Sequence, residues 1–148
     1  MSQGSTGRER AAKPAVLRPA EIAPRSRGGG VQTIPLVTRK VGSTSIINGI
    51  TIFEPGAAVP MHSHNVEESV VVLSGRAIVV IDGVEQQLGP DDTTFLPANI
   101  PHYFRNASQT EGMRILWIYA SIDATRTIIE TGQTRTIDDE HVSPASQQ

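Results

Sequence analysis

The sequence contains no cysteine and only six aromatic residues among 148. Without cysteine the chain has no disulfide, no thiolate ligand and no thiol nucleophile, so any metal must be held by histidine or carboxylate groups. No apolar run approaches the roughly 18 residues of a membrane span, and the N-terminus lacks the apolar middle section of a secretory signal. We therefore expect a cytoplasmic protein with no membrane partner.

Charges of the two signs are unevenly distributed. Residues 1–30 contain six basic and two acidic residues, whereas residues 31–148 contain seven basic and 13 acidic residues. Nucleic-acid contact or an organellar transit sequence could explain a basic N-terminus, but this one has no aromatic residue for base stacking and no convincing amphipathic pattern. We interpret residues 1–30 as a flexible basic tail that ends in a run of three glycines, and we expect no nucleic-acid partner.

From residue 31 onward, short runs rich in Val, Ile and Thr alternate with turn signals, and no strong helical periodicity of three turns or more intervenes. The clearest stretch is 69–88, where Ser74-Gly75 and Asp82-Gly83 separate two apolar runs and the run 84–88 and predict consecutive antiparallel hairpins. Further strands are predicted at residues 45–53, 93–96, 102–105 and 113–120. These strands predict one all-β domain, a sandwich or barrel, over residues 31–136.

Two C-terminal segments are less regular. Residues 123–132 fit either a short helix, with Asp123 as its N-cap and Gly132 after its end, or a β-branched strand through residues 125–129. The sequence does not decide between them. Residues 137–148 are acidic and then polar, and we expect them to form a flexible tail.

Three of the four histidines lie in the region of the predicted hairpins, with one residue between His62 and His64. Alternate side chains of a strand share a face, so His62 and His64 point the same way, and Glu68 joins them if the chain turns without changing phase. Glu67 would then point away. His102 follows a stiff turn bracketed by two prolines. We predict that these three histidines and Glu68 converge.

Three imidazoles and one carboxylate favour a divalent first-row transition metal. Imidazole suits Fe, Ni, Cu and Zn, and the carboxylate adds tolerance for Mn. Four protein ligands leave two octahedral positions for water, dioxygen or a chelating substrate. A single histidine on a strand is usually a surface or hydrogen-bonded core residue, but the shared phase of this set favours a metal site. His141, in the acidic C-terminal segment, is interpreted as an ordinary residue.

These residues resemble the two motifs of the cupin superfamily. The first motif has the spacing G-x5-H-x-H-x3-E-x6-G, which this chain matches at Gly56, His62, His64, Glu68 and Gly75. The second has the spacing G-x5-P-x-G-x2-H-x3-N, which the chain matches at Pro97, His102 and Asn106. Asp91 and Asn99 stand where the motif has its two glycines. Asn tolerates positive φ better than most residues, so Asn99 can still make the turn.

The resemblance implies a small single-domain cupin with a double-stranded β-helix, or jelly-roll barrel. It also implies one divalent metal per chain, Fe, Mn, Ni or Zn, bound by His62, His64, Glu68 and His102. Similar cupins include dioxygenases, isomerases, decarboxylases, lyases, polyketide cyclases and proteins that only bind ligands, so the fold does not fix the reaction.

We expect a metal-dependent enzyme of dioxygenase type or of isomerase or cyclase type, whose small oxygen-rich substrate chelates the metal. The alternative is a non-catalytic module or sensor that holds a small ligand with the same metal. No catalytic acid or base is identified from the sequence. Side chains that could surround the metal ligands, each more often structural, are Glu67, Tyr103, Arg105, Asn106, Trp117 and Tyr119.

A homodimer is expected as well. Residues 46–52 and 115–118 are apolar on both faces of their predicted strands. One face fills the barrel, and the other would be exposed unless a second copy covers it.

Overall fold

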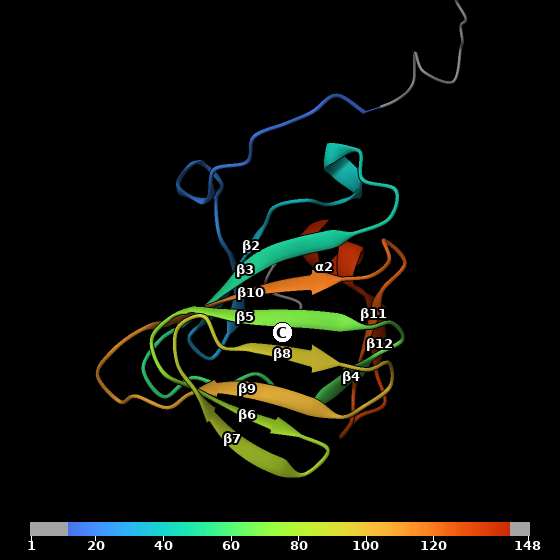
Figure 1. Cartoon of the computed structure of the whole chain (residues 1–148). Coiled ribbons are helices and arrows are strands. Elements are labelled where there is room, and N and C mark those ends of the chain that lie inside the picture. Colours follow the sequence, from blue (N-terminus) through green and yellow to red (C-terminus); the bar gives the residue numbers. More distant parts are fainter. Residues whose placement is uncertain (1–11, 143–148) are drawn as a thin grey trace, which may run out of the picture.

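The computed structural model describes residues 12–142 as two six-stranded antiparallel sheets that pack face to face (Figure 1). The first sheet has the order β1 (Arg25–Gly28), β2 (Val31–Pro35), β3 (Ile47–Phe53), β10 (Met113–Tyr119), β5 (Glu68–Ser74) and β8 (Thr93–Leu96). The second has the order β12 (Thr134–Thr136), β11 (Thr125–Ile128), β4 (His62–His64), β9 (His102–Asn106), β6 (Ala77–Ile81) and β7 (Val84–Leu88). The predicted all-β jelly roll is confirmed. No helix within residues 12–142 is both long and apolar enough to cross a membrane.

Alternation along the strands places the core between the two sheets. Strand β10 alternates buried and half-buried residues along its whole length, and its buried members Ile115 and Trp117 join the main core cluster. From the second sheet, Val79 and Phe104 reach the same cluster. The core therefore lies between the two sheets.

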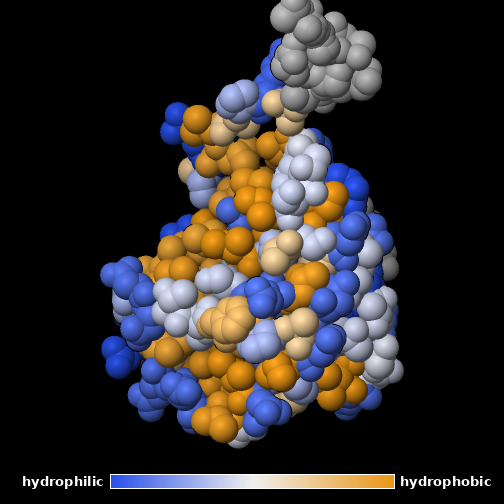
Figure 2. Space-filling model, turned by 45° about the vertical axis from the view of Figure 1, so that its right-hand side comes forward, coloured by the Kyte–Doolittle hydropathy of each residue, from blue (hydrophilic) through white to orange (hydrophobic). Residues whose placement is uncertain are grey.

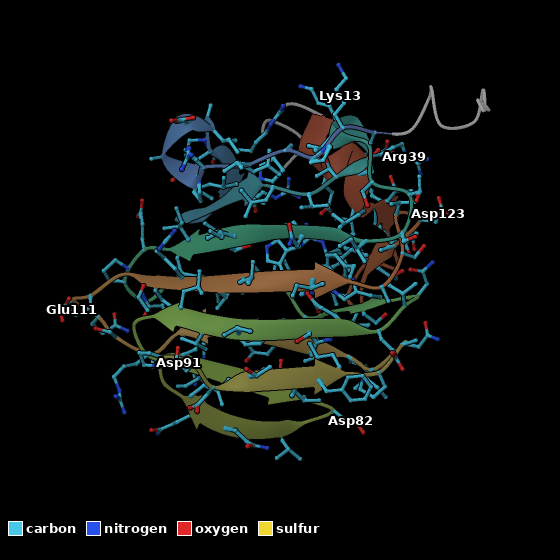
Figure 3. All side chains as sticks on the ribbon, turned by 45° about the horizontal axis from the view of Figure 1, so that its top comes forward. Lys13, Arg39, Asp82, Asp91, Glu111 and Asp123 are labelled. Carbon is cyan, nitrogen blue, oxygen red and sulfur yellow. The ribbon has the colours of Figure 1, made fainter. Side chains whose placement is uncertain are left out.

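Predicted strands and turns agree closely with the structure. Strand β8 has the predicted bounds, and β3, β9 and β10 differ from theirs by one or two residues. In the β6–β7 turn, Asp82 and Gly83 both have positive φ, 50° and 84°, as a two-residue hairpin turn requires. Asn99 (φ 67°) and Asp91 (φ 75°) stand where the second cupin motif has glycine, and both adopt a left-handed backbone conformation. Figure 3 shows Asp82 and Asp91 in turns at the ends of strands.

The segment that the sequence left open, residues 123–132, contains a strand. Strand β11 pairs with β4 on one side and with β12 on the other. The β-branched residues Thr125, Thr127 and Ile128 therefore outweigh the helix signals of Asp123 and Gly132. Asp123 instead forms an ion pair with Arg39, in which Nη2 of Arg39 lies 3.0 Å from Oδ1 of Asp123. The two residues lie near each other in Figure 3.

The domain extends beyond residues 31–136 at both ends, which corrects the predicted tails. A 3₁₀ turn, η1 (Pro19–Glu21), and strand β1 lie within the segment expected to be flexible, and β1 pairs with β2. At the other end, residues 137–142 form helix α2 (Ile137–Val142). Its first residue, Ile137, is only 2% exposed and packs in the core, which holds the helix against the barrel. The rest of the predicted tails, residues 1–11 and 143–148, lies outside the described residues. A second 3₁₀ turn, η2 (Arg39–Val41), precedes β3.

Candidate metal centre

The predicted ligands come from three strands that meet at one end of the barrel. His62 and His64 occupy alternate positions of β4, and His102 opens the neighbouring strand β9, directly opposite His62. Their candidate ligand nitrogens all lie within 4.8 Å of one another, and all three side chains are buried. Glu68 opens β5 in the facing sheet, so the set lies between the sheets. The three histidines can hold a metal ion.

Each imidazole ring is oriented by a backbone carbonyl. The Nδ1 atom lies 2.7 Å from Pro60 O in His62, 2.9 Å from Thr125 O in His64 and 2.8 Å from Ile100 O in His102. A carbonyl oxygen only accepts hydrogen bonds, so each ring carries a proton on Nδ1 and donates it. When the rings are neutral, the three Nε2 atoms are left as bare acceptors, the usual state of histidines that bind a metal.

Glu68 brings a fourth acceptor to this cluster. Its Oε1 lies 3.3 Å from Nε2 of His64 and 3.3 Å from Nε2 of His102. Within residues 12–142, neither Oε1 of Glu68 nor Nε2 of His102 has a hydrogen-bond partner, although both are buried. Buried polar atoms without partners are costly, and a carboxylate facing bare nitrogens needs a positive charge between them. A divalent cation fits this donor set.

The charge states fit a metal as well. Burial raises the pKa of the Glu68 carboxyl, but protons that His102 and His64 can carry toward it outweigh burial and lower the pKa to about 2; a divalent cation between the same groups would favour the anion in the same way. Glu68 is therefore an anion at neutral pH. Burial, followed by the charges that His102 and His64 can carry, lowers the pKa of His62 well below its ordinary value. His62 is therefore neutral and able to donate its Nε2 lone pair.

The structure separates the other candidate side chains into two groups. Tyr119 faces the site, with its hydroxyl 3.4 Å from Nε2 of His64, and Trp117 donates its indole proton to Thr51 Oγ1 at 2.8 Å inside the barrel. Glu67 is exposed, as predicted, and Arg105 forms a surface ion pair with Glu85.

Tyr103 and Asn106 do not belong to the ligand cluster either. Tyr103 is half-buried and its position in β9 follows His102, so it points to the opposite face of the strand. Asn106 is 1% exposed, and its amide group donates to the carbonyls of Phe53, Glu54 and Glu111. It therefore ties loops together at a distance from the metal ligands.

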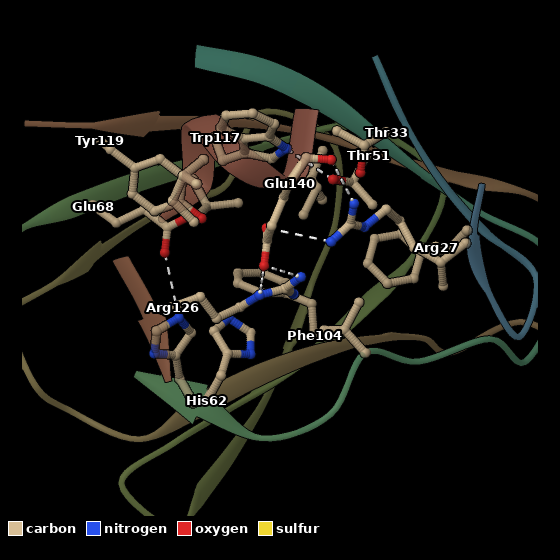
Figure 4. A pocket seen from close by; sticks show the side chains of 17 residues that line it. Arg27, Thr33, Thr51, His62, Glu68, Phe104, Trp117, Tyr119, Arg126 and Glu140 are labelled. Carbon is tan, nitrogen blue, oxygen red and sulfur yellow. Dashed lines mark hydrogen bonds and ion pairs between the residues drawn. The ribbon is translucent and has the colours of Figure 1, made fainter. Parts of the chain in front are cut away.

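Sequence analysis missed a buried ion-pair cluster above the histidines, formed by Arg27, Arg126 and Glu140. Arg126 donates from Nε and Nη2 to Oε2 of Glu140 at 2.8 and 2.7 Å, and Arg27 Nη2 lies 3.3 Å from Oε1 (Figure 4). One signal was available, since Arg126 is a lone charge in a β-branched run. Arg27 and Glu140 gave none, because both fell in predicted tails.

Two cavities meet at this cluster. The inner one, of about 60 Å³, is bounded by His62, Glu68 and His102 and by the aromatic rings of Phe104 and Trp117 (Figure 4). The outer one, of about 420 Å³, lies on the other side. Both are lined by Arg27, Val31, Val59, Arg126 and Glu140. The ion-pair cluster therefore stands between the metal ligands and the outer cavity.

Comparison with known proteins places the chain in a family. Residues 49–119 match the model of the cupin domain. The chain is also 36% identical to polyketide synthase CurC of Streptomyces cyaneus over 105 residues. These residues make up 70% of this chain and 68% of that protein. The chain belongs to the cupin family. The resemblance found from the two motifs is thereby confirmed. The four predicted ligands lie within the matched residues 49–119, and their binding of a metal stays a prediction.

Two further comparisons match different shares of the chain. Protein SchB of Streptomyces halstedii is 33% identical over 88 residues, which are 59% of this chain and 63% of that protein. The structure of the polyketide cyclase RemF from Streptomyces resistomycificus superposes with a TM-score of 0.68 over 91% of this chain and 97% of its own, at 17% identity. At that identity the match shows a shared fold.

Proposed function

We propose that this cupin is a metal-dependent enzyme whose single divalent transition metal, Fe, Mn, Ni or Zn, is bound by His62, His64, Glu68 and His102. The observation that carries the proposal is the convergence of carbonyl-oriented histidines on the buried carboxylate of Glu68, whose Oε1 has no hydrogen-bond partner in the described part of the chain. The substrate is a small oxygen-rich molecule that chelates the metal through carbonyl or enol oxygens. A metal bound in this position would act as a Lewis acid and polarise those oxygens.

Tyr119 is the side chain placed to assist. Burial, and then the negative charge of Glu68, raise the pKa of the Tyr119 phenol well above its ordinary value, so the hydroxyl keeps its proton at neutral pH. It lies beside His64, where it can donate a hydrogen bond to a substrate oxygen. Phe104 and Trp117 line the inner cavity with apolar surface that excludes water and suits a planar substrate.

Isomerase or cyclase chemistry is the reaction class that we favour over dioxygenase chemistry. The names of CurC and RemF connect those two relatives with polyketide synthesis and cyclisation. Poly-β-ketone chains offer paired carbonyl oxygens that chelate a metal, and closing a ring on them needs no oxidant.

A cytoplasmic location stays a prediction.

Metal analysis of the purified protein, by mass spectrometry with inductively coupled plasma, is the first test. The metal-loaded protein is then incubated with poly-β-ketones in air and under argon, with product mass and oxygen uptake recorded. His102→Ala, which removes a ligand, is the control. A product of unchanged mass, or of mass lower by one water, that forms equally under argon supports a cyclase or isomerase.

Other results would point elsewhere. Stoichiometric oxygen uptake would assign dioxygenase chemistry instead. Tight diketone binding without turnover would favour the non-catalytic alternative. Failure of the wild-type protein to retain any of the four metals would contradict the proposal as a whole.

A further inference from the structure

The ion-pair cluster at the mouth of the barrel holds a carboxylate between two arginines. The side chains of Arg27, Arg126 and Glu140 are 14%, 17% and 9% exposed. Glu140 accepts two hydrogen bonds from Arg126, and its other oxygen faces Arg27 (Figure 4). Paired donors of this kind are a strong arrangement for binding a carboxylate.

The two arginines belong to the barrel, whereas the carboxylate comes from the chain end. Arg126 lies opposite His64 in the β4–β11 pair, so the two side chains share the inner face. A register shift between Ser26 and Gly28 in β1 makes Arg27 a bulged residue, and bulges commonly redirect a side chain. Glu140 lies on α2, a helix of six residues that closes the barrel end.

The outer cavity carries an excess of positive charge. Its walls include Arg27, Arg126 and Arg135, and Arg135 lies opposite Arg126 in the β11–β12 pair. Among the described residues that line it, Glu140 is the only carboxylate. A volume of about 420 Å³ is within the range of small-molecule sites. Its charge and size suit an organic anion.

We propose that the outer cavity binds a carboxylate group of the substrate through Arg27 and Arg126, and that the Glu140 side chain occupies this position when no substrate is bound. The inference rests on the proposed function and narrows its substrate class to metal-chelating ketones that carry a free carboxylate. The diketone end lies in the inner cavity beside the metal ligands, and the acid end replaces Glu140. Substrate entry then requires a shift of α2.

Two probes that differ in one group test this inference. Benzoylacetone is an uncharged 1,3-diketone, and its 4-carboxylate derivative adds only the anion. Their dissociation constants are measured by isothermal titration with the wild-type protein and with the variants Glu140→Gln and Arg27→Gln. Arg105→Gln is the matched control, since it removes an arginine from an exposed ion pair with Glu85 that does not include α2.

The ratio of the two dissociation constants is the readout. We expect Glu140→Gln to increase the preference for the carboxylate probe about tenfold, and Arg27→Gln to decrease it by a similar factor, as for the gain or loss of a charge-assisted hydrogen-bond pair. Arg105→Gln should leave this ratio unchanged, and the affinity for benzoylacetone should be the same in every variant. A ratio that stays within twofold of wild type in both cavity variants would overturn the proposal and leave the cluster as a structural clasp.

Failure of this inference is distinguishable from failure of the proposed function. Metal content is measured in the same samples. A protein without metal contradicts the proposed function. The dissociation constant of the carboxylate probe alone, compared between wild type and Arg27→Gln, then still reports the arginine contacts, because those contacts do not include the metal. A metal-bearing protein with an unchanged ratio contradicts the inference alone.

Discussion

Arg27 and Glu140, 113 positions apart in the sequence, join the two ends of the described chain. Nη2 of Arg27 lies 3.3 Å from Oε1 of Glu140, and Nη1 donates to the backbone oxygen of the same residue at 3.0 Å. Both side chains are largely buried. The contact ties β1 to α2, so neither segment is a free tail.

Loss of this contact should destabilise the fold. Glu140→Gln leaves two buried guanidinium groups without their carboxylate, and we expect the free energy of unfolding to fall by about 3 kcal/mol. Arg27→Gln should cost less, because Arg126 still pairs with Glu140. The double variant should cost less than the sum of the two in urea denaturation. Strict additivity, or a loss no larger than that of the exposed-pair variant Arg39→Gln, would contradict the coupling.

Glu68 and Glu67 are adjacent carboxylates with different surroundings. Glu68→Gln replaces the buried anion beside His64 and His102 with a neutral amide, so metal content after dialysis should fall sharply. Glu67→Gln changes an exposed side chain and should retain the metal. Metal per chain, measured for both variants at equal protein concentration, checks this. Metal loss in Glu67→Gln with retention in Glu68→Gln would show that Glu68 is not the ligand.

Asn106 should be important for stability and not for metal binding. Asn106→Ala removes an amide that donates to three backbone carbonyls and an oxygen that accepts from Ser108 N at 2.9 Å. We expect a loss of about 2–4 kcal/mol in urea denaturation, since buried partners are left unsatisfied. Metal per folded chain should equal wild type. Gln87→Ala, an exposed substitution on β7, is the control, and a metal-free but fully stable Asn106→Ala would contradict this role.

Gly75 and Gly83 lie in different turns and share a left-handed backbone conformation, with φ of 86° and 84°. A Cβ at Gly83 would meet nothing within 4 Å, so Gly83→Ala should cost about 1–2 kcal/mol, for backbone strain alone. A Cβ at Gly75 would lie 2.4 Å from Gly112 O, which adds a backbone clash. Gly75→Ala should therefore lower the thermal midpoint much more than Gly83→Ala. Equal midpoints would show that the β5–β6 turn adapts freely.

A homodimer stays a prediction, and the outer face of the first sheet is where we place its interface. Leu116 and Ile118 on β10 point outward and are half-buried, and Phe95 on β8 is 64% exposed. Figure 2 shows apolar side chains between polar ones on the side in view. Light scattering should give twice the chain mass at micromolar concentration. Phe95→Lys should favour the monomer, and Val84→Lys, at an exposed site of the other sheet, should not. A wild-type monomer would refute the prediction.

Local sequence determined most of the central strands and the shared inward phase of the predicted ligands. Period-two alternation fixes which side chains share a face, so the phase of His62, His64 and Glu68 was available without coordinates. Turn chemistry acts over two or three residues, which is why Asp82-Gly83 and Asn99 could be located from composition. These features depend on neighbours along the chain.

Tertiary structure decided what the ends of the chain do. Strand β1 exists because β2 offers it a partner, and α2 is held by the burial of Ile137 and by the ion pairs of Glu140. The segment around Arg126 became a strand because it has neighbours on both sides, β4 and β12. Local propensity was evenly balanced there, and pairing with distant strands outweighed it. The arginine cluster above the predicted metal ligands follows from those long-range pairings, so the sequence offered only the lone charge of Arg126 as a signal of it.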